Sequence, residues 1–252
     1  MKSVIIGLCI LLFIFAAQAG TFLDTFDDEK LVNYQELVMF GIDALGPSPW
    51  EIIDGELEII NKGAPRLLTI GEEMWQDYDI EFNVKPLEKH GPGIIGIAAR
   101  IKGTWGVVCG IDDFEGPAAE PIATCFGGNL RGLSFFTYDK KPHRLLKLRK
   151  WATFKLSVHG KRLTFWINGK QVLGPVILEA KIFEHGVEFP DYPNGRIGLG
   201  LTNYTARFDN FKATGPGIPN TDGLSVTSQT KLATTWGNLK QARDNITPPK
   251  EK

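Results

Sequence analysis

One segment, residues 151–172, limits what this chain can fold into more than any other: WATFKLSVHGKRLTFWINGKQV. Apolar residues alternate with polar ones in both of its halves: Phe154, Leu156 and Val158, then Leu163, Phe165 and Ile167. This period of two predicts two strands, each with one buried face. Gly160-Lys161 fits a two-residue type II′ turn, in which glycine takes the first central position. The turn predicts three apolar cross-strand pairs: Val158–Leu163, Leu156–Phe165 and Phe154–Ile167.

A lone hairpin is only marginally stable in water, so this one needs a larger sheet to cover its apolar face. Other short segments have strand character and are separated by turn residues: 21–26, 50–53, 56–59, 67–70, 78–85, 94–101, 105–111, 124–126, 132–138, 195–202 and 206–213. Residues 29–49 and 181–193 are predicted to be irregular connections. No amphipathic helix is evident between residues 21 and 214. The pattern predicts an all-β protein, a two-sheet antiparallel jelly-roll sandwich.

The two ends of the chain differ from this strand series. Residues 1–19 have a basic start at Lys2, an apolar run and a small-residue site at Ala17-Gln18-Ala19. This is the pattern of a secretory signal peptide cut after Ala19, and it predicts a secreted or periplasmic protein. The alternative is an uncleaved N-terminal anchor. Residues 215–252 are rich in Thr, Ser, Asn and Gln, which predicts a flexible polar tail. The folded domain is therefore expected over residues 20–214.

Charge and hydropathy exclude some partners. The chain has 28 Lys and Arg against 29 Asp and Glu, so it lacks the basic excess of a nucleic-acid-binding or anionic-membrane-binding protein. No second long apolar stretch follows the signal segment, so no membrane span is expected after its cleavage.

Two cysteines remain after the signal segment, Cys109 and Cys125. Export would place them in an oxidising compartment, and pairing them leaves no thiol over. A disulfide is therefore predicted. The alternative is two buried free cysteines, because Cys109 has the same parity as its apolar neighbours Val107 and Ile111.

Four segments in order carry a family resemblance: TFLDTFDD (21–28), WEIIDGELEI (50–59), the 151–172 hairpin, and GRIGLGLTNYTARFDNFKA (195–213). Together they resemble the concanavalin A-like lectin/glucanase superfamily in its laminin-G-like form. The hairpin pattern WxxxxLxVxGxxLxFWxNG is also similar to the 3-keto-disaccharide hydrolase family. The resemblance implies a jelly roll whose concave sheet binds sugar and whose first and last strands pair.

The sequence lacks the residue patterns of several common classes of enzyme. Glucanase members of that superfamily carry a Glu-x-Asp-x-(x)-Glu strand, and no strand here has it. Glu56 and Glu58 have suitable spacing for a carboxylate pair, but an edge-like hairpin favours solvated charges. The four histidines are scattered, and no nucleophile, phosphate-loop or metal-ligand motif is present. The sequence therefore leans towards a protein without catalytic activity.

Calcium is the cofactor that the acidic residues allow, and no other is indicated. If the first and last strands pair, Asp24, Asp27 and Asp209 come close enough to share a Ca²⁺. A second acidic group is predicted to be a solvated loop instead: Asp112, Asp113, Glu115 and Glu120.

The face opposite the predicted core suggests a ligand site. In 94–101, the small residues Gly96 and Ala98 share their parity with Arg100, which leaves room beside a bidentate donor. Trp166 and His159 lie opposite the core in the central hairpin, and Trp can stack on a sugar ring. We predict that Arg100, Trp166 and His159 bind carbohydrate on one concave face.

The alternatives at these positions are structural. Lys155 stands across from Trp166, which allows a surface cation–π contact. Arg100 could equally be a buried ion-pair partner. The functional hypothesis from the sequence is a secreted, non-catalytic jelly-roll module that binds carbohydrate or a surface partner. A glycoside-processing hydrolase resembling the 3-keto-disaccharide hydrolases and a purely structural extracellular module are the alternatives.

Overall fold

The structure, a computed structural model, describes residues 19–28, 30–40, 50–114, 120–182, 186 and 188–221. The predicted signal peptide, apart from Ala19, and the predicted tail from residue 222 lie outside the described residues. The strands are β1 (Ala19–Asp24), β2 (Gln35–Val38), β3 (Trp50–Ile53), β4 (Glu56–Ile60), β5 (Arg66–Ile70), β6 (Tyr78–Lys89), β7 (Ile94–Lys102), β8 (Trp105–Asp112), β9 (Ile122–Asn129), β10 (Phe135–Pro142), β11 (Ala152–His159), β12 (Arg162–Ile167), β13 (Lys170–Ile177), β14 (Lys181–Ile182), β15 (Glu188–Phe189), β16 (Arg196–Leu201) and β17 (Tyr204–Pro216). In this part of the chain no helix is long and apolar enough to cross a membrane.

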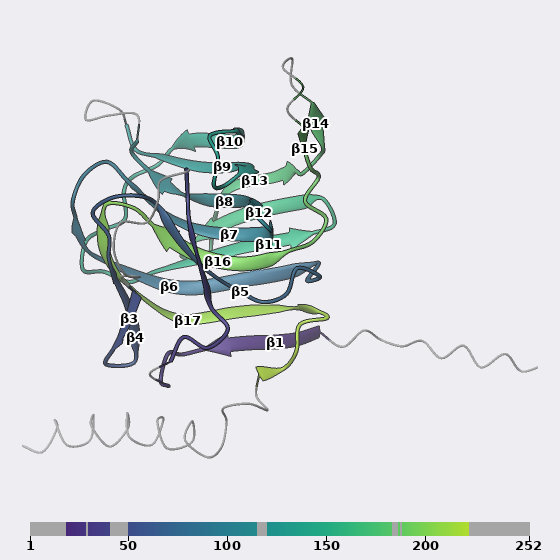
Figure 1. The fold of residues 1–252 in the computed structure, drawn as a ribbon. Coiled ribbons are helices and arrows are strands. Elements are labelled where there is room, and N and C mark those ends of the chain that lie inside the picture. The colour runs from purple at the N-terminus through teal and green to yellow at the C-terminus, as the bar shows by residue number, and fades with distance from the viewer. Residues whose placement is uncertain are drawn as a thin grey trace, which may run out of the picture.

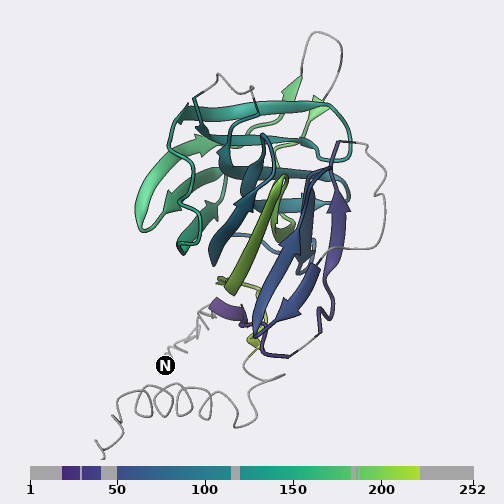
Figure 2. The ribbon, with the colours of Figure 1, turned by 90° about the vertical axis from the view of Figure 1, so that its left-hand side faces the viewer.

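Two large antiparallel sheets pack face to face as a sandwich (Figure 1). The eight-stranded sheet has the order β13-β12-β11-β6-β17-β4-β3, with β1 paired to β17. The seven-stranded sheet has the order β10-β9-β8-β7-β16-β5-β2. Strands from early and late in the sequence are neighbours in both sheets: β17 pairs with β1 and β4, and β16 lies between β7 and β5. Figure 2 shows a green strand from late in the chain between blue strands from its first part. The predicted all-β sandwich, consistent with a jelly roll, is confirmed.

The central hairpin forms β11 and β12 in the predicted register. Val158 pairs with Leu163, Leu156 with Phe165 and Phe154 with Ile167. Gly160 has a φ of 55°, which glycine adopts without strain at the first position of a type II′ turn. All six apolar side chains belong to the core between the sheets, so the turn and the hydrophobic pattern specify the same register.

Two connections that the sequence predicts to be irregular contain short strands. Strand β2 lies inside 29–49 and forms the edge of the seven-stranded sheet by pairing with β5. Its sequence, QELV, is short and has little apolar alternation, so the period of the sequence does not reveal this strand. Strands β14 and β15, two residues each, form a separate hairpin that projects from the sandwich in Figure 1.

The pairing of first and last strands implied by the family resemblance is present between β1 and β17.

Cys109 of β8 and Cys125 of β9 stand directly opposite each other and form a disulfide, with 4.1 Å between their Cα atoms. Both residues are fully buried in the core between the sheets. The core-facing parity of Cys109 is therefore compatible with the bond, because Cys125 faces the same side of the sheet.

Removing this disulfide is expected to lower the free energy of unfolding by about 3 kcal/mol, because the bond closes a loop of this size in the unfolded chain. The two cysteines are 16 residues apart in sequence. The measurement is urea unfolding of the Cys109→Ala/Cys125→Ala double variant against the oxidised wild type. Either single variant should cost nearly as much as the double, because each removes the same bond. Equal stability of wild type and double variant would contradict the expectation.

Candidate functional site

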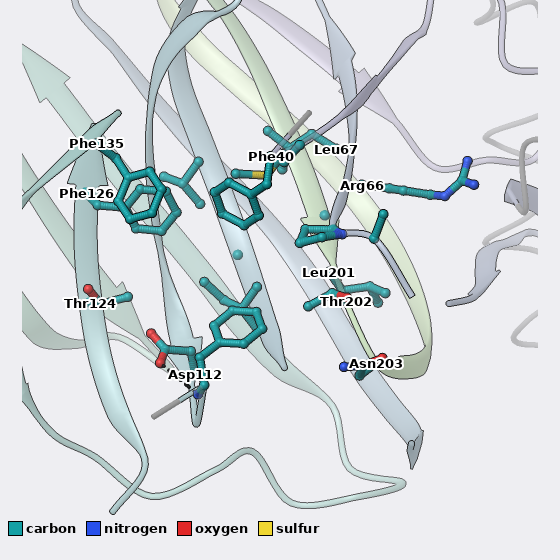
Figure 3. Close-up of a pocket in the computed structure, with 18 of the residues that line it drawn as sticks. Phe40, Arg66, Leu67, Asp112, Thr124, Phe126, Phe135, Leu201, Thr202 and Asn203 are labelled. Carbon is teal, nitrogen blue, oxygen red and sulfur yellow. Dashed lines mark hydrogen bonds between the residues drawn. The ribbon is translucent and has the colours of Figure 1, made fainter. Parts of the chain in front are cut away.

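A pocket of about 500 Å³ opens on the outer face of the seven-stranded sheet, away from the main core (Figure 3). Strands β5, β7, β8, β9, β10 and β16 supply its floor and sides, and Met39 and Phe40, which follow β2, supply part of its wall. Pockets of this volume are typical of sites for small molecules.

Glycines keep the floor of the pocket open. Gly110, Gly96 and Gly200 stand opposite one another on the adjacent strands β8, β7 and β16. Thr124 on β9 and Leu67 on β5 continue the row at its two ends. A Cβ atom added to Gly96 would lie 3.0 Å from the side chain of Val108. Gly96 and Gly200 line the pocket, and the missing side chains leave its floor low there. At Gly110 and Gly200 an added Cβ would collide with the carbonyl oxygens of Ile95 and Arg66, so the close approach of the strands also requires glycine.

One end of the pocket is aromatic. The rings of Phe126 and Phe135, on the paired strands β9 and β10, have centroids 5.8 Å apart, and Phe40 lies 5.4 Å from Phe135. Figure 3 shows these three rings gathered on one side of the pocket. Phe135 is 47% exposed, so a large apolar surface faces the opening. Exposed aromatic surface in a pocket is typical of a binding site.

The other end of the pocket is polar. Asp112, at the end of β8, is only 5% exposed, and its carboxylate accepts a hydrogen bond from the N–H of Phe114 at 3.4 Å. Thr202 and Asn203, just after β16, face it across the pocket (Figure 3). The Thr202 hydroxyl donates to the carbonyl of Gly63. Asp112 is thus a nearly buried carboxylate placed where it can meet the polar part of a ligand.

Arg66 also lines the pocket, but its guanidinium points away from it (Figure 3). It forms a 2.9 Å ion pair with Glu36, which also accepts a hydrogen bond from the indole N–H of Trp50. This cation therefore holds β2 against β5 and is not directed at a ligand.

The prediction that Arg100 and Trp166 share one concave face is wrong, because β7 and β12 belong to different sheets. The pairing of β7 is irregular between Ala99 and Lys102, and Arg100 has a φ of 56°. This bulge turns the Arg100 side chain inwards, where it is 1% exposed. It therefore does not lie on the outer face of β7, where Gly96 and the pocket are. The structural alternative, a buried ion-pair partner, describes Arg100, whose guanidinium lies 3.5 Å from Asp77. Gly96, by contrast, lines the pocket as its parity predicts.

Trp166 and His159 lie on the outer face of the eight-stranded sheet, outside the pocket. The Lys155 ammonium is 5.7 Å from the centre of the Trp166 ring, which is the surface cation–π contact that the sequence left open. The Asp79 carboxylate accepts hydrogen bonds from Ser157 and from His159 (3.1 Å) and pairs with Lys155 (3.0 Å). Trp166, His159, Lys155, Ser157 and Asp79 therefore form a network of contacts on the surface of this sheet.

This group of partners makes Asp79 a pH-sensitive contributor to stability. Burial alone would raise the pKa of Asp79, but hydrogen bonds from Ser157, Lys155 and His159 outweigh it and lower the pKa. A lowered pKa stabilises the fold above the ordinary carboxyl pKa of about 4, and this stabilisation is lost as the pH falls through the folded-state value. Asp79→Asn should therefore lower stability at pH 7 by less than about 1 kcal/mol, since the site is partly exposed.

The measurement for Asp79 is urea unfolding of wild type and Asp79→Asn at several pH values. The difference between the two should still be present at pH 5 and should shrink below about pH 4. A difference that persists unchanged well below pH 4 would contradict the expectation.

The predicted calcium ligands do not assemble into a metal site. Among the described residues, no three His, Cys, Asp or Glu side chains come together as a metal ion requires. Asp24 accepts hydrogen bonds from the N–H of Phe26 (2.8 Å) and the hydroxyl of Tyr34 (2.9 Å), Asp27 accepts one from Thr25, and Asp209 accepts one from the N–H of Asn210 (2.6 Å). Burial raises the pKa of both Asp24 and Asp209. Local hydrogen bonding thus accounts for these carboxylates.

The carboxylates of Glu56 and Glu58 are also engaged. Arg207 donates to Glu58 at 2.6 Å and to Glu56 at 2.9 Å, and the Lys85 ammonium lies 3.2 Å from Glu56. The pair is a charge network on β4 and β17 and lacks the free acid and nucleophile of a glycosidase.

Comparisons with known proteins agree with this architecture. A family described as the 3-keto-α-glucoside-1,2-lyase-like domain matches residues 24–214. A structure from work on endo-acting O-glycanases of human gut microbiota that initiate mucin breakdown is 13% identical, with a TM-score of 0.53, and covers 77% of this chain and 98% of that chain. A pseudo β-1,3-glucanase and immunostimulatory antigen of Mycobacterium tuberculosis is 12% identical, with a TM-score of 0.51, and covers 77% and 98%.

A Bacillus subtilis protein of unknown function with a galectin-like fold is 13% identical, with a TM-score of 0.50, and covers 80% of this chain and 98% of that chain. At such identities the likeness shows the fold alone. No curated protein matches the sequence of this chain.

Proposed function

This chain belongs to the family of 3-keto-α-glucoside-1,2-lyase-like domains, and we propose that it binds a saccharide in the pocket of the seven-stranded sheet. One observation carries the proposal: the pocket combines exposed aromatic rings with a nearly buried carboxylate, Asp112. A sugar ring has apolar faces that pack on aromatic rings and a rim of hydroxyls that donate to carboxylates. Phe114, next to Asp112 and 44% exposed, offers a ring at the polar end itself.

The lining of the pocket favours binding over glycoside hydrolysis by two carboxylates. Among the described residues that line it, Asp112 is the one carboxylate. A retaining or inverting glycosidase needs a second carboxyl group across the scissile bond. A non-catalytic role is therefore the simplest function for these side chains.

A second candidate is elimination from a 3-keto-glucoside, which the description of the family suggests. A ketone at C3 acidifies the hydrogen at C2, so a single base can remove it. The electron pair then forms a C1–C2 double bond while the C1–O bond breaks and the leaving oxygen takes up a proton. Asp112 is the candidate base, because it is the carboxylate at the polar end of the pocket.

We also propose that the protein acts after export. The apolar run and the small-residue site in residues 1–19 support this, and so does the disulfide between Cys109 and Cys125, since disulfides persist in oxidising compartments.

The test of binding is a glycan array followed by calorimetric titration of the purified full-length protein. Asp112→Asn and Phe114→Ala should each weaken saccharide binding at least about tenfold, because each alters a lining side chain at the polar end, where the sugar ring is placed. Trp151→Ala is the matched control: Trp151 is 42% exposed but contacts Lys85 of the other sheet. Binding that survives both pocket variants and disappears in Trp151→Ala would place the site elsewhere, and no binding to any glycan would overturn the proposal.

The second candidate is tested by incubating the protein with 3-keto-glucosides and following release of the group at C1. Turnover that is lost in Asp112→Asn would support the elimination. Binding without turnover in the wild type would leave saccharide binding as the function and would reject the lyase.

A further inference from the structure

We infer that the preferred ligand of this pocket is a monosaccharide joined to an apolar group, such as an aryl glycoside, and not a disaccharide. The inference rests on the proposed saccharide binding and concerns what occupies the aromatic end. It follows from the order in which side chains are placed along the strands.

The glycine row divides the pocket into two ends. On one side of it, the register places Phe126 opposite Val108, and Val108 opposite Ala98, on three neighbouring strands. On the other side, Asp112 at the end of β8 stands between Ile122 and Ile94. The aromatic surface and the carboxylate are therefore on opposite sides of the bare floor, and one ligand can reach both by lying across it.

The polar end suits one sugar ring. Asp112 offers carboxylate oxygens, and Thr202 and Asn203 line the same end (Figure 3). Phe114, beside Asp112, adds an exposed ring on which a sugar face can pack. Hydroxyl donors on the ligand thus find acceptors within this half of the pocket.

The aromatic end does not suit a second sugar ring. Its lining is formed by apolar side chains, among them Met39, Phe40, Phe126 and Phe135. The polar side chain of the described lining at this end is that of Thr137, opposite Phe126 on β10, whereas Lys140 stands opposite Thr124, where the glycine row ends. A hexose placed here would set several hydroxyls against apolar side chains with few hydrogen-bond partners, and polar groups that lose water without gaining hydrogen bonds are costly. An apolar ring would gain from the same surface.

The size of the pocket agrees with a ligand of two rings. Its volume of about 500 Å³ lies within the range of sites that hold drug-sized molecules. The second ring should therefore be apolar, because the chemistry of the lining, and not the available space, decides between the two classes of ligand.

The experiment is calorimetric titration of the full-length protein with phenyl α-D-glucoside, maltose and methyl α-D-glucoside. We expect the phenyl glucoside to bind at least about tenfold more tightly than maltose, a ratio typical of a change in apolar contact. Maltose that binds as tightly as the phenyl glucoside would overturn this inference but would leave saccharide binding intact. If none of the three probes binds, the proposed function itself fails for α-glucosides.

Variants identify the part of the pocket that gives the preference. Phe135→Ala should lower the affinity ratio of phenyl to methyl glucoside severalfold, because it removes one ring of the pair at the aromatic end. Trp151→Ala removes an equally exposed aromatic side chain outside the pocket and should leave that ratio unchanged. A ratio that is unaffected by Phe135→Ala would show that the phenyl group binds elsewhere and would overturn the inference.

Discussion

Replacing Phe165 with alanine is expected to lower the free energy of unfolding by about 3–5 kcal/mol, as truncation of a core aromatic residue does. Phe165 on β12 is fully buried, and its ring meets that of Phe154 edge-on at 5.3 Å. Its side chain lies in the closely packed core between the two sheets, so the surrounding side chains can fill the vacated space only in part. The measurement is urea unfolding, with an unchanged dependence on urea concentration as the sign of an unchanged folded state.

Lys161 provides the control within the same hairpin. Its side chain is exposed and lies 3.5 Å from Asp191 in a surface ion pair. Such pairs contribute little, so Lys161→Ala should cost under about 0.5 kcal/mol. Similar losses for Phe165→Ala and Lys161→Ala would mean that the side of the hairpin assigned to the core is wrong.

The hairpin could be predicted in detail because its information is local. A two-residue turn fixes which residues are opposite, and the apolar residues on both strands then agree on the buried face. The same reasoning holds for β3 and β4, which pair around Asp54-Gly55 with Ile52 opposite Leu57. In these two hairpins the tight turn and the alternation agree, so the sequence specifies both the strands and their register.

The pocket could be predicted only in part, because its residues are brought together by long-range pairing. Gly96 and Ala98 indicated open space on the outer side of β7, and this is where the pocket lies. Phe40 comes from a segment without strand character, and nothing in its local sequence places it beside Phe135. One signal was available: Phe126 follows Cys125, so a core-facing cysteine puts a phenylalanine on the outer face, where large apolar residues often mark a binding site.

Arg100 shows where strand parity fails. The prediction assumed that residues two apart keep the same face through the whole of β7. The irregular pairing after Ala99 adds a residue to one strand, and a shift of one residue moves a side chain to the other face. A bulge of this kind has no clear sequence signature here, since Arg100 adopts a positive φ without being glycine or asparagine.

The contacts of Arg100 define a structural role. Its guanidinium donates to the carbonyl of Tyr192 at 3.1 Å and to the carbonyl of Gly160 at 3.2 Å. Its backbone N–H donates to the Tyr78 hydroxyl at 2.8 Å, and that hydroxyl donates to the carbonyl of Gly195. Burial raises the pKa of Tyr78 well above its usual range, which keeps the hydroxyl proton available for this bond. Arg100 thus ties β7 to the central turn and to the segment before β16.

Arg100→Met is expected to lower the free energy of unfolding by about 3 kcal/mol. Methionine fills much of the same space but leaves the buried carbonyl of Tyr192 and the partly buried carbonyl of Gly160 without this donor, and a buried group that loses its partner costs on the order of 1–3 kcal/mol. Arg100→Lys is the matched variant, since it keeps the charge but cannot donate in a planar fork to two carbonyls, and it should restore only part of the loss. Urea unfolding of the three proteins gives these differences.

Saccharide titration of Arg100→Met separates this structural role from the ligand-binding role that strand parity suggested. Arg100 does not line the pocket, and its guanidinium is directed at Tyr192 and Gly160. At a temperature where the variant remains folded, its affinity for saccharide should therefore equal that of the wild type, although its stability is lower. A variant that keeps its stability and loses its affinity would return Arg100 to the binding site and contradict the arrangement of β7 described above.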